Sequence, residues 1–335
     1  MALMTRSINR FKTEIDTFRH PTCFDARDSE CTCGSCPEMN PSLIKKNITY
    51  LYHKGTNNLG SIQMRIPQSA NCIKFLNSHI GVRGICLESR LTSQIKNEII
   101  VLSKFAAVKI SRIDLEKLME NDNSVYIDPV DAEINLEKFL DIKGLIASSF
   151  LQEQYFKQNS DVPVILMYHS SDFRLKGIQA QKDYYSMAYF GSLSRLPHSP
   201  ELLPFLEIVK TPLSYQPNTK LPIFSDKLKD FSAHFAIGAE LPRYVFKPFT
   251  KGLIASSVGA ITLISRNEKE ALLLLGDDYP YVSIDSSLKS ISDMAKFMKL
   301  TFGGDEWNKA QMSHQKFVNF TCPKFHALNW SKILV

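Results

Sequence analysis

The sequence predicts two α/β domains, each a parallel sheet with helices on both faces. Three observations lead to this fold class. The chain has 335 residues, whereas a domain averages about 150 residues. Short apolar runs rich in Ile, Val, Leu and Tyr recur along it, as is typical of buried parallel strands. Amphipathic stretches separate these runs, and the alternation of strands with helices favours βαβ units and doubly wound sheets.

The first domain is predicted to span residues 45–175. Residues 1–44 show no sustained periodicity and are interpreted as an irregular, cysteine-containing leader. The apolar runs that follow predict strands at 48–52, 82–87, 98–102, 124–127, 145–148 and 164–168. Helical patterns predict helices at 69–79, 112–121 and 150–158. The polar stretch 172–184 is predicted to link the two domains.

The second domain is predicted to span residues 185–305. Its strands are expected at 187–191, 231–237, 260–264 and 280–283. Its helices are expected at 200–209, 251–258 and 268–275, and a proline-bearing loop at 211–222. From residue 288 the pattern is mostly helical, and residues 306–335 are a predicted helical tail. Large apolar residues continue to the end of this tail, which indicates that they are buried.

The charge and the apolar pattern narrow the function classes. The formal net charge is +6. Such a charge favours acidic ligands, namely nucleotide phosphates, anionic lipid headgroups or nucleic acid. The alternative is that it only keeps the protein soluble. Basic tracts interleaved with aromatic residues are missing, so nucleic acid is not the expected ligand. The sequence has no apolar run of about 18 residues, and residues 1–12 lack the apolar core of a signal peptide. We therefore expect a cytoplasmic protein.

Four cysteines gather in the leader, at Cys23, Cys31, Cys33 and Cys36. Four thiolates can hold zinc or an iron–sulfur cluster. The usual zinc knuckle has two Cys-x-x-Cys pairs, and only Cys33 and Cys36 form one here. Their polar, loop-like surroundings favour an exposed appendage without a catalytic role, with zinc as the alternative.

One segment of the second domain carries the clearest ligand-binding pattern. Pro248, followed by Thr250 as the expected N-cap, predicts the start of a helix. The free N–H groups and the positive dipole end of a helix start bind phosphates well. Lys247 and Lys251 add positive charge there, and Gly259 is expected to end the helix before a buried strand. The segment therefore predicts a site for a nucleotide diphosphate.

This segment has the pattern Lys-Pro-x-Thr-Lys-Gly at 247–252 and resembles the donor-binding domain of group-1-like bacterial glycosyltransferases of the GT-B type. The strand at 231–237 and the turn at 276–281 are similar to that domain as well. The resemblance implies two Rossmann-like domains facing a cleft, a nucleotide-diphospho-sugar as co-substrate, and no catalytic metal. Many retaining members carry a pair of glutamates flanking this helix. Here Ser256 and Ser257 fill the helix, which leaves retention or inversion of the anomeric centre open.

Two more residues of the second domain are predicted to bind the donor. His234 lies in the strand that precedes the helix and is predicted to donate to a phosphate or sugar oxygen. A buried core histidine is the alternative reading of this position. Arg243 lies in the following loop and is predicted to reach the diphosphate.

In the first domain, the loop after strand 48–52 contains Gly60, Ser61, Gln63 and Arg65. Ligands bind open α/β sheets at loops of this kind, and the resemblance implies that this loop faces the cleft. Arg65 is predicted to contact a donor phosphate, and Gln63 an acceptor hydroxyl. A plain turn between strand and helix is the alternative.

Two polar residues follow other strands of the first domain and are candidate bases for an acceptor hydroxyl. Asp131 comes shortly after the strand at 124–127, and His169 follows the strand at 164–168. Both are expected at the carboxyl edge of the sheet. An inverting transferase needs such a base, whereas a retaining one works mainly by stabilising the leaving diphosphate. Turn chemistry for Asp131 and a core position for His169 are the alternatives.

The resulting hypothesis is a glycosyltransferase that acts in surface polysaccharide synthesis. The expected partners are a nucleotide sugar and a glycan or lipid-linked acceptor, with peripheral association at the inner face of the membrane as an option. In the resembled architecture the tail at 306–335 crosses back to the first domain. The alternatives are a nucleotide-sugar epimerase and a non-catalytic protein of the same fold that binds glycan or nucleotide.

Overall fold

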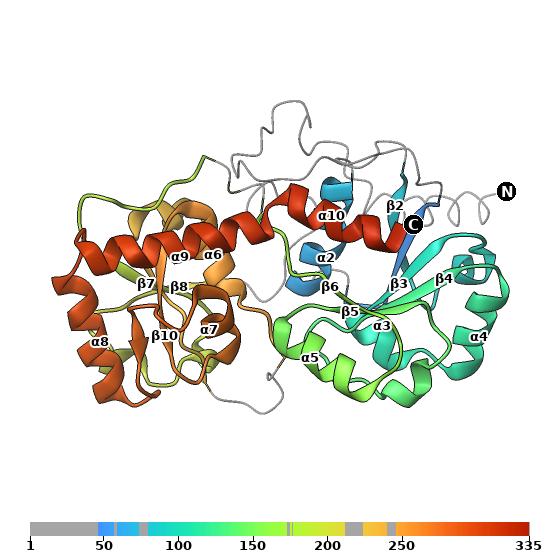
Figure 1. Ribbon diagram of the computed structural model, residues 1–335, viewed down its shortest axis with the longest axis horizontal. Helices are drawn as coiled ribbons and strands as arrows, with labels where there is room; N and C mark the ends of the chain where they lie inside the picture. The colour runs from blue at the N-terminus through green and yellow to red at the C-terminus, as the bar shows by residue number, and fades with distance from the viewer. Residues whose placement is uncertain are drawn as a thin grey trace, which may run out of the picture. The chain divides into compact units, whose positions relative to one another are not determined.

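The computed structural model describes residues 46–56, 59–73, 80–172, 175, 177–211, 224–239 and 246–334. The chain forms two compact units (Figure 1). Of the described residues, the first unit contains those from 46 to 170 and from 323 to 334, and the second contains those between them. Each unit has its own parallel sheet, so the predicted fold class of two parallel α/β sheets is confirmed.

The first unit contains a six-stranded parallel sheet of order β2-β1-β3-β4-β5-β6. Its strands are β1 (Ile48–Tyr52), β2 (Val82–Cys86), β3 (Ile99–Ser103), β4 (Ser124–Asp128), β5 (Gly144–Ala147) and β6 (Val164–Leu166). Four of them (β1, β3, β4 and β5) are almost wholly buried, which explains why they appear in the sequence as uninterrupted apolar runs. Ser103 and Asp128 are paired in register at the carboxyl ends of β3 and β4.

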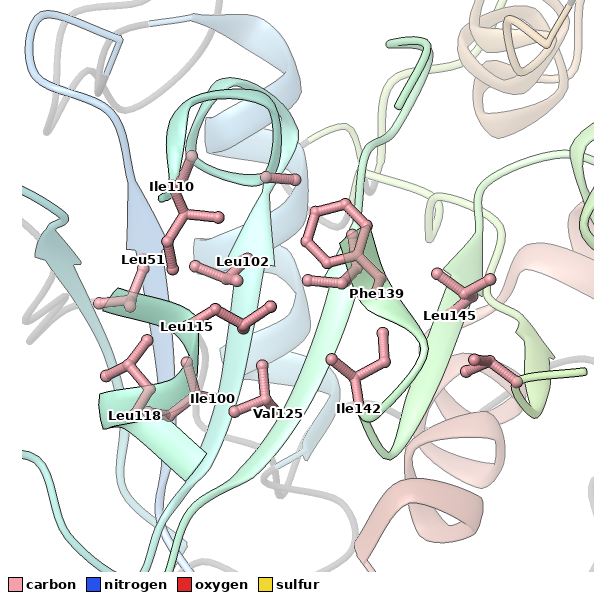
Figure 2. Close-up of a cluster of buried hydrophobic side chains, with 14 of the residues drawn as sticks. Leu51, Ile100, Leu102, Ile110, Leu115, Leu118, Val125, Phe139, Ile142 and Leu145 are labelled. Carbon is pink, nitrogen blue, oxygen red and sulfur yellow. The ribbon is translucent and has the colours of Figure 1, made fainter. Parts of the chain in front are cut away.

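Helices cover both faces of this sheet. They are α2 (Gly60–Ile73), α3 (Lys104–Lys109), α4 (Arg112–Glu120), α5 (Phe150–Asn159) and α10 (Pro323–Leu334), with short 3-10 helices at Arg90–Gln94 and Leu136–Phe139. One core cluster joins β1 and β3 to α2 and α10. The other lies under α3, α4 and α5 and includes Leu102, Leu115 and Phe139 (Figure 2). The two clusters bury the two faces of the sheet separately.

Two of these helices begin where the sequence predicted, because a serine caps each of them. The Ser111 hydroxyl accepts the Asp114 N–H at 3.0 Å, and the Ser149 hydroxyl accepts the Gln152 N–H at 3.1 Å. Each bond satisfies one of the N–H groups that a helix start leaves without a partner.

The second unit contains a five-stranded parallel sheet of order β11-β10-β9-β7-β8. Its strands are β7 (Met187–Gly191), β8 (Glu207–Lys210), β9 (Ala233–Phe235), β10 (Ile261–Ser265) and β11 (Val282–Ser283). Its helices are α6 (Thr250–Val258), α7 (Lys269–Leu275), α8 (Leu288–Leu300) and α9 (Asp305–Thr321), with 3-10 helices at Leu193–Arg195, Pro200–Leu202 and Ser225–Asp230.

Two predicted helices differ from the structure. The helix expected at 200–209 is a short 3-10 helix followed by strand β8. Pro204 removes a backbone donor, and the β-branched Ile208 and Val209 favour a strand. The helix expected at 69–79 begins much earlier, at Gly60, and contains Pro67. The prediction placed this first turn in a loop because glycine and proline usually mark loops.

Helix α10 belongs to the first unit, although α9, directly before it, belongs to the second. It lies beside α2 (Figure 1). The buried Trp330 ring makes an edge-on contact with Tyr50 of β1 at 6.0 Å between ring centres. The predicted tail began at residue 306, whereas the division between the units falls between Cys322 and Pro323. Pro323 can open a helix but not continue one, which accounts for the break at this point.

None of the helices in the described part of the chain is both long and apolar enough to cross a membrane.

Candidate functional site

The start of helix α6 differs in detail from the prediction. Thr250 is the first helical residue, and Phe249 precedes it as an N-cap without a side-chain hydrogen bond, so the predicted capping role of Thr250 is wrong. The Phe249 ring lies against Gly252, where an added Cβ would come within 1.9 Å of it. It also stacks on Phe317 of α9 at 6.1 Å. Burial of this ring, rather than a polar cap, fixes the start of the helix.

The opposite end of α6 agrees with the prediction. Gly259 ends the helix with a φ of 80°, in the left-handed region that glycine adopts without strain. Its N–H bonds back to Ser256. The chain then enters β10, whose residues are all buried. The helix is therefore a short element held between a packed aromatic ring and a glycine turn.

Lys251 lies in the first turn of α6, and its ammonium group is 4.2 Å from the ring centre of Tyr189 in β7. Such a contact attracts a cation to an aromatic face. Burial and, to a smaller extent, the charge of Lys247 together lower the pKa of Lys251 to about 7. Lys251 is therefore divided between its charged and neutral forms near neutral pH.

The charges around Lys251 are mostly positive. Lys247 is exposed just before the helix, and Arg195 is close enough to depress the pKa of Lys251. Glu268 acts in the opposite sense and raises that pKa. One oxygen of Glu268 accepts the N–H of Gly238 at 2.9 Å. Among the described residues, three cations and one carboxylate act at this helix start, which is a setting suited to a phosphate anion.

His234 lies in β9, the central strand of the second sheet. It is 2 % exposed, and its ring lies 4.6 Å from that of Phe190. Burial lowers the pKa of His234 to about 3, so the imidazole is neutral. The unit's own residues enclose His234, which favours the alternative reading as a buried core histidine. Arg243 lies outside the described residues.

A second buried histidine, His314 of α9, was not singled out in the sequence. Its Nε2 accepts the Thr262 N–H at 3.1 Å, and its Nδ1 lies 2.5 Å from the Ser256 hydroxyl. Because Nε2 accepts a backbone donor, the ring proton is on Nδ1. Burial lowers the pKa of His314 to about 3. This residue ties α9 to α6 and β10, and only its place on an amphipathic helix hinted at a buried role.

In the first unit, Arg65 is a buried structural residue. Its side chain is 0 % exposed, its Nε lies 3.0 Å from Asp128 Oδ2, and its Nη2 donates to Asp128 Oδ1 at 3.2 Å. Its Nη1 also donates to the Met167 carbonyl. Burial raises the pKa of Asp128, and the Arg65 guanidinium opposes that rise. These contacts occupy the Arg65 guanidinium within the first unit and do not favour the predicted contact with a donor phosphate.

The neighbours of Arg65 that were predicted as cleft residues open helix α2. Gly60 is its first residue, and Ser61 follows in the first turn, partly buried. The side chain of Gln63 lies outside the described residues.

The two predicted bases lie in different surroundings. Asp131 is partly exposed and pairs with Lys104 at 2.5 Å. His169 is 2 % exposed, and its Nδ1 has no hydrogen-bond partner among the described residues. Burial lowers the pKa of His169 well below its usual value, and the Arg65 guanidinium adds to this. His169 is thus enclosed, whereas the Asp131 carboxylate is partly exposed, and the acceptor contacts predicted for both remain predictions.

Within the described residues, no group of three or more His, Cys, Asp or Glu side chains is arranged to hold a metal ion. The four leader cysteines, Cys23, Cys31, Cys33 and Cys36, lie outside the described residues.

No protein-family model matches the sequence, and no curated protein matches it. Solved structures do match. A sucrose-phosphate synthase from Thermosynechococcus elongatus aligns with a TM-score of 0.59 at 8% identity, over 86% of this chain and 98% of that one. HepE from Anabaena, in complex with UDP and glucose, aligns with a TM-score of 0.58 at 9% identity, over 87% and 99%. A glycosyltransferase from Rickettsia africae aligns with a TM-score of 0.57 at 9% identity, over 87% and 98%.

These matches extend over most of this chain and nearly all of each other chain, so the likeness covers the whole architecture. At such low identity it concerns the fold. The chain has the GT-B fold of these glycosyltransferases, as the resemblance of residues 231–283 led us to expect.

Proposed function

We propose that the protein is a glycosyltransferase that moves a sugar from a nucleotide-diphospho-sugar to a hydroxyl group of a glycan or glycoconjugate. The observation that carries this proposal is the cationic start of α6, where Lys247 and Arg195 are near enough to lower the pKa of Lys251 in the first turn of the helix. The fold supports it, since similar structures include a sucrose-phosphate synthase and a protein that holds UDP and glucose.

The chemistry of sugar transfer explains why this charge matters. When the bond between the sugar and the diphosphate breaks, negative charge develops on the departing nucleoside diphosphate. Groups that neutralise this charge without rearranging accelerate the reaction more than groups that bind the substrate alone. Lys251 is placed for this role because it is held against Tyr189 in the first turn of the helix.

The first unit supplies the proposed acceptor side. Asp131 follows β4 at the carboxyl edge of the sheet, where open α/β sheets bind their ligands. Of the polar residues predicted there, Asp131 keeps a partly exposed carboxylate, while His169 is enclosed. We include in the proposal a surface polysaccharide or its lipid-linked precursor as the acceptor, reached at the inner face of the membrane.

A nucleotide-release assay tests the proposal. The purified protein is incubated with UDP-, GDP-, ADP- and dTDP-sugars, with and without a mixture of alkyl glycosides as acceptors, and free nucleotide is measured. We expect release from one class of donor and an increase when an acceptor is present. Tight nucleotide binding without any release would favour a non-catalytic binding protein, and an altered sugar without release would favour an epimerase.

The same assay in charge variants tests the site. Lys247→Ala and Lys251→Ala are each expected to weaken nucleotide binding by about 1.5–3 kcal/mol, the contribution of a charge-assisted hydrogen bond. Lys269→Ala is a matched control, because Lys269 is an exposed lysine in the first turn of the next helix, α7. Equal nucleotide affinity in all three variants, measured by calorimetry, would contradict the assignment of the phosphate site to α6.

A further inference from the structure

At the carboxyl edge of the first sheet, two neighbouring loops are joined by an ion pair that the sequence did not indicate. Lys104 follows directly on β3, and Asp131 comes three residues after the end of β4. These strands are adjacent and in register up to the pair Ser103 and Asp128. The Lys104 ammonium lies 2.5 Å from Asp131 Oδ1. The order of the strands therefore brings together two charges that are far apart in the sequence.

The backbone at both loops adopts a conformation that side chains usually avoid. Lys104 has a φ of 27°, and Val130, next to Asp131, has a φ of 58°. A β-branched residue rarely occupies this left-handed region, and residues held there cluster at functional sites. The Val130 N–H donates to Asp128 Oδ1 at 3.3 Å, and the Ser148 hydroxyl donates to the Val130 carbonyl at 2.5 Å. The surrounding residues thus hold the loop in this shape.

The exposure of the ion pair differs from that of its neighbours. The side chains of Lys104 and Asp131 are 19% and 15% exposed, whereas Asp128 is enclosed and paired with Arg65. The second oxygen of Asp131, Oδ2, has no hydrogen-bond partner among the described residues. Asp131 can therefore accept a hydrogen bond from a ligand while Lys104 holds its other oxygen.

The interior behind the pair carries an unsatisfied polar group. His169 follows β6, two strands further along the sheet, and its enclosed Nδ1 has no partner among the described residues. The charge of Lys104 acts on His169 and lowers its pKa, as do burial and Arg65. Buried polar atoms without a partner are rare and are usually explained by function or by a bound molecule. The hydrogen bonds among the described residues at this edge of the sheet therefore leave one enclosed polar atom, His169 Nδ1, without a partner.

We propose that Lys104 is a positioning residue for the acceptor: it holds the Asp131 carboxylate so that Oδ2 accepts the hydrogen bond of the acceptor hydroxyl. This assignment rests on the proposed function. The acceptor class is a compound with a free alcohol group, and water is its smallest member. The left-handed backbone at Lys104 and Val130 fixes the loops from which the two charged side chains extend. Lys104 itself does not contact the reacting atoms.

Four variants test the role of Lys104: Lys104→Met, Lys104→Arg, Asp131→Asn and the double variant of Lys104→Met with Asp131→Asn. The probe is the UDP-sugar that the wild-type protein turns over fastest, with water as the acceptor and released UDP as the readout. We expect Lys104→Met and Asp131→Asn each to lower kcat by about 10- to 100-fold, the cost of misplacing a reacting group. UDP affinity should stay unchanged. Lys104→Arg should restore most of the rate.

The double variant separates positioning from a general structural effect. If Lys104 acts through Asp131, its loss costs nothing further once the carboxylate is gone, so the double variant equals Asp131→Asn. Lys109→Met is the control, because Lys109 is an exposed lysine at the other end of α3. Thermal unfolding of every variant shows whether it is folded.

Each outcome decides the proposal. Wild-type kcat in Lys104→Met would overturn the assignment while leaving the proposed function intact. Equal losses of kcat and UDP affinity, with a lower unfolding temperature and no rescue by arginine, would show that the ion pair only stabilises the loops. A wild-type protein that neither binds nor cleaves any nucleotide sugar would overturn the proposed function, and the role of Lys104 with it.

Discussion

At the scale of single residues, the environment of Lys251 changes its charge near neutral pH. Its pKa is lowered from 10.5 to about 7 because burial penalises the ammonium form. Between these two pH values the unfolded chain binds a proton that the folded chain lacks. Folding is therefore favoured as the pH rises through this window, and the charged form costs stability below about pH 7. In the proposed function, the bound diphosphate would supply the negative charge that offsets this cost.

This titration predicts a pH-dependent affinity for UDP. Between pH 8.5 and pH 6.5 the protonated fraction of Lys251 rises, and wild-type affinity is expected to rise by up to about 10-fold. Lys251→Met should lose this part of the pH dependence and keep only the part due to the phosphate groups of UDP. Calorimetry at several pH values in both proteins measures the difference. Parallel pH profiles would show that Lys251 does not titrate with binding.

At the same scale, the sequence pattern located cations at a helix start but did not reveal which polar side chains the fold encloses. Lys247 and Lys251 lie at the helix start where the pattern placed them. Arg65 and His234 were taken for ligand-binding residues because their side chains suit phosphates, but one pairs with Asp128 and the other lies under Phe190. Lys104 was not predicted as a site residue because its partner, Asp131, is distant in the sequence. Exposure and long-range pairing are set by the fold, and local patterns do not reveal them.

At the scale of elements, α6 depends on the fit of Phe249 against Gly252. An alanine at 252 would place its Cβ 1.9 Å from the ring. Alanine favours a helix by about 1 kcal/mol over glycine, whereas overpacking costs about 1–3 kcal/mol. We expect Gly252→Ala to lower the free energy of unfolding, measured by urea denaturation. In a Phe249→Leu background the same change should be neutral or stabilising. A stabilising effect in the wild-type background would contradict this packing.

Helix α10 provides a second prediction at this scale. Trp330 is fully buried against Tyr50, and the Tyr126 hydroxyl donates to the Ile333 carbonyl at 3.5 Å. Trp330→Ala is expected to lower the free energy of unfolding by about 3–5 kcal/mol, the usual cost of removing a large core side chain. Lys332→Ala, an exposed neighbour on the same helix, should change it by about 0.5 kcal/mol or less. Similar urea midpoints for the two variants would show that α10 is only loosely held.

The predicted strands and helices also show which sequence patterns identify secondary structure correctly. Strands β1, β3, β4 and β10 were predicted because each is a short, buried, apolar run between polar stretches. Helix α4 was predicted from its helical pattern, and the Ser111 cap found in the structure lies directly before it. The helix expected at 200–209 was wrong, since its apolar residues suit a strand as well as a helix. Periodicity over so few residues does not distinguish the two.

At the scale of the whole molecule, the alternation of strands and helices was sufficient to predict two parallel sheets, and similar solved structures share that architecture. The division of the chain between the two units was harder to predict. The last helix returns to the first unit, and its contacts, such as that of Ser69 with His326, join residues 257 positions apart. The apolar residues at the end of the sequence indicated that the tail is buried. They did not indicate that the division between the two units falls at Pro323.

The return of α10 has a consequence for synthesis. A ribosome makes the chain from its first residue to its last, so β1 and α2 emerge long before the helix that covers them. Until Trp330 has left the ribosome, the face of the first sheet around Tyr50 remains without its cover. The closing contacts span nearly the whole chain, and such distant pairing is slow and leaves apolar surface open meanwhile. The first unit is therefore begun first and completed last, and the nascent chain needs protection from aggregation throughout its translation.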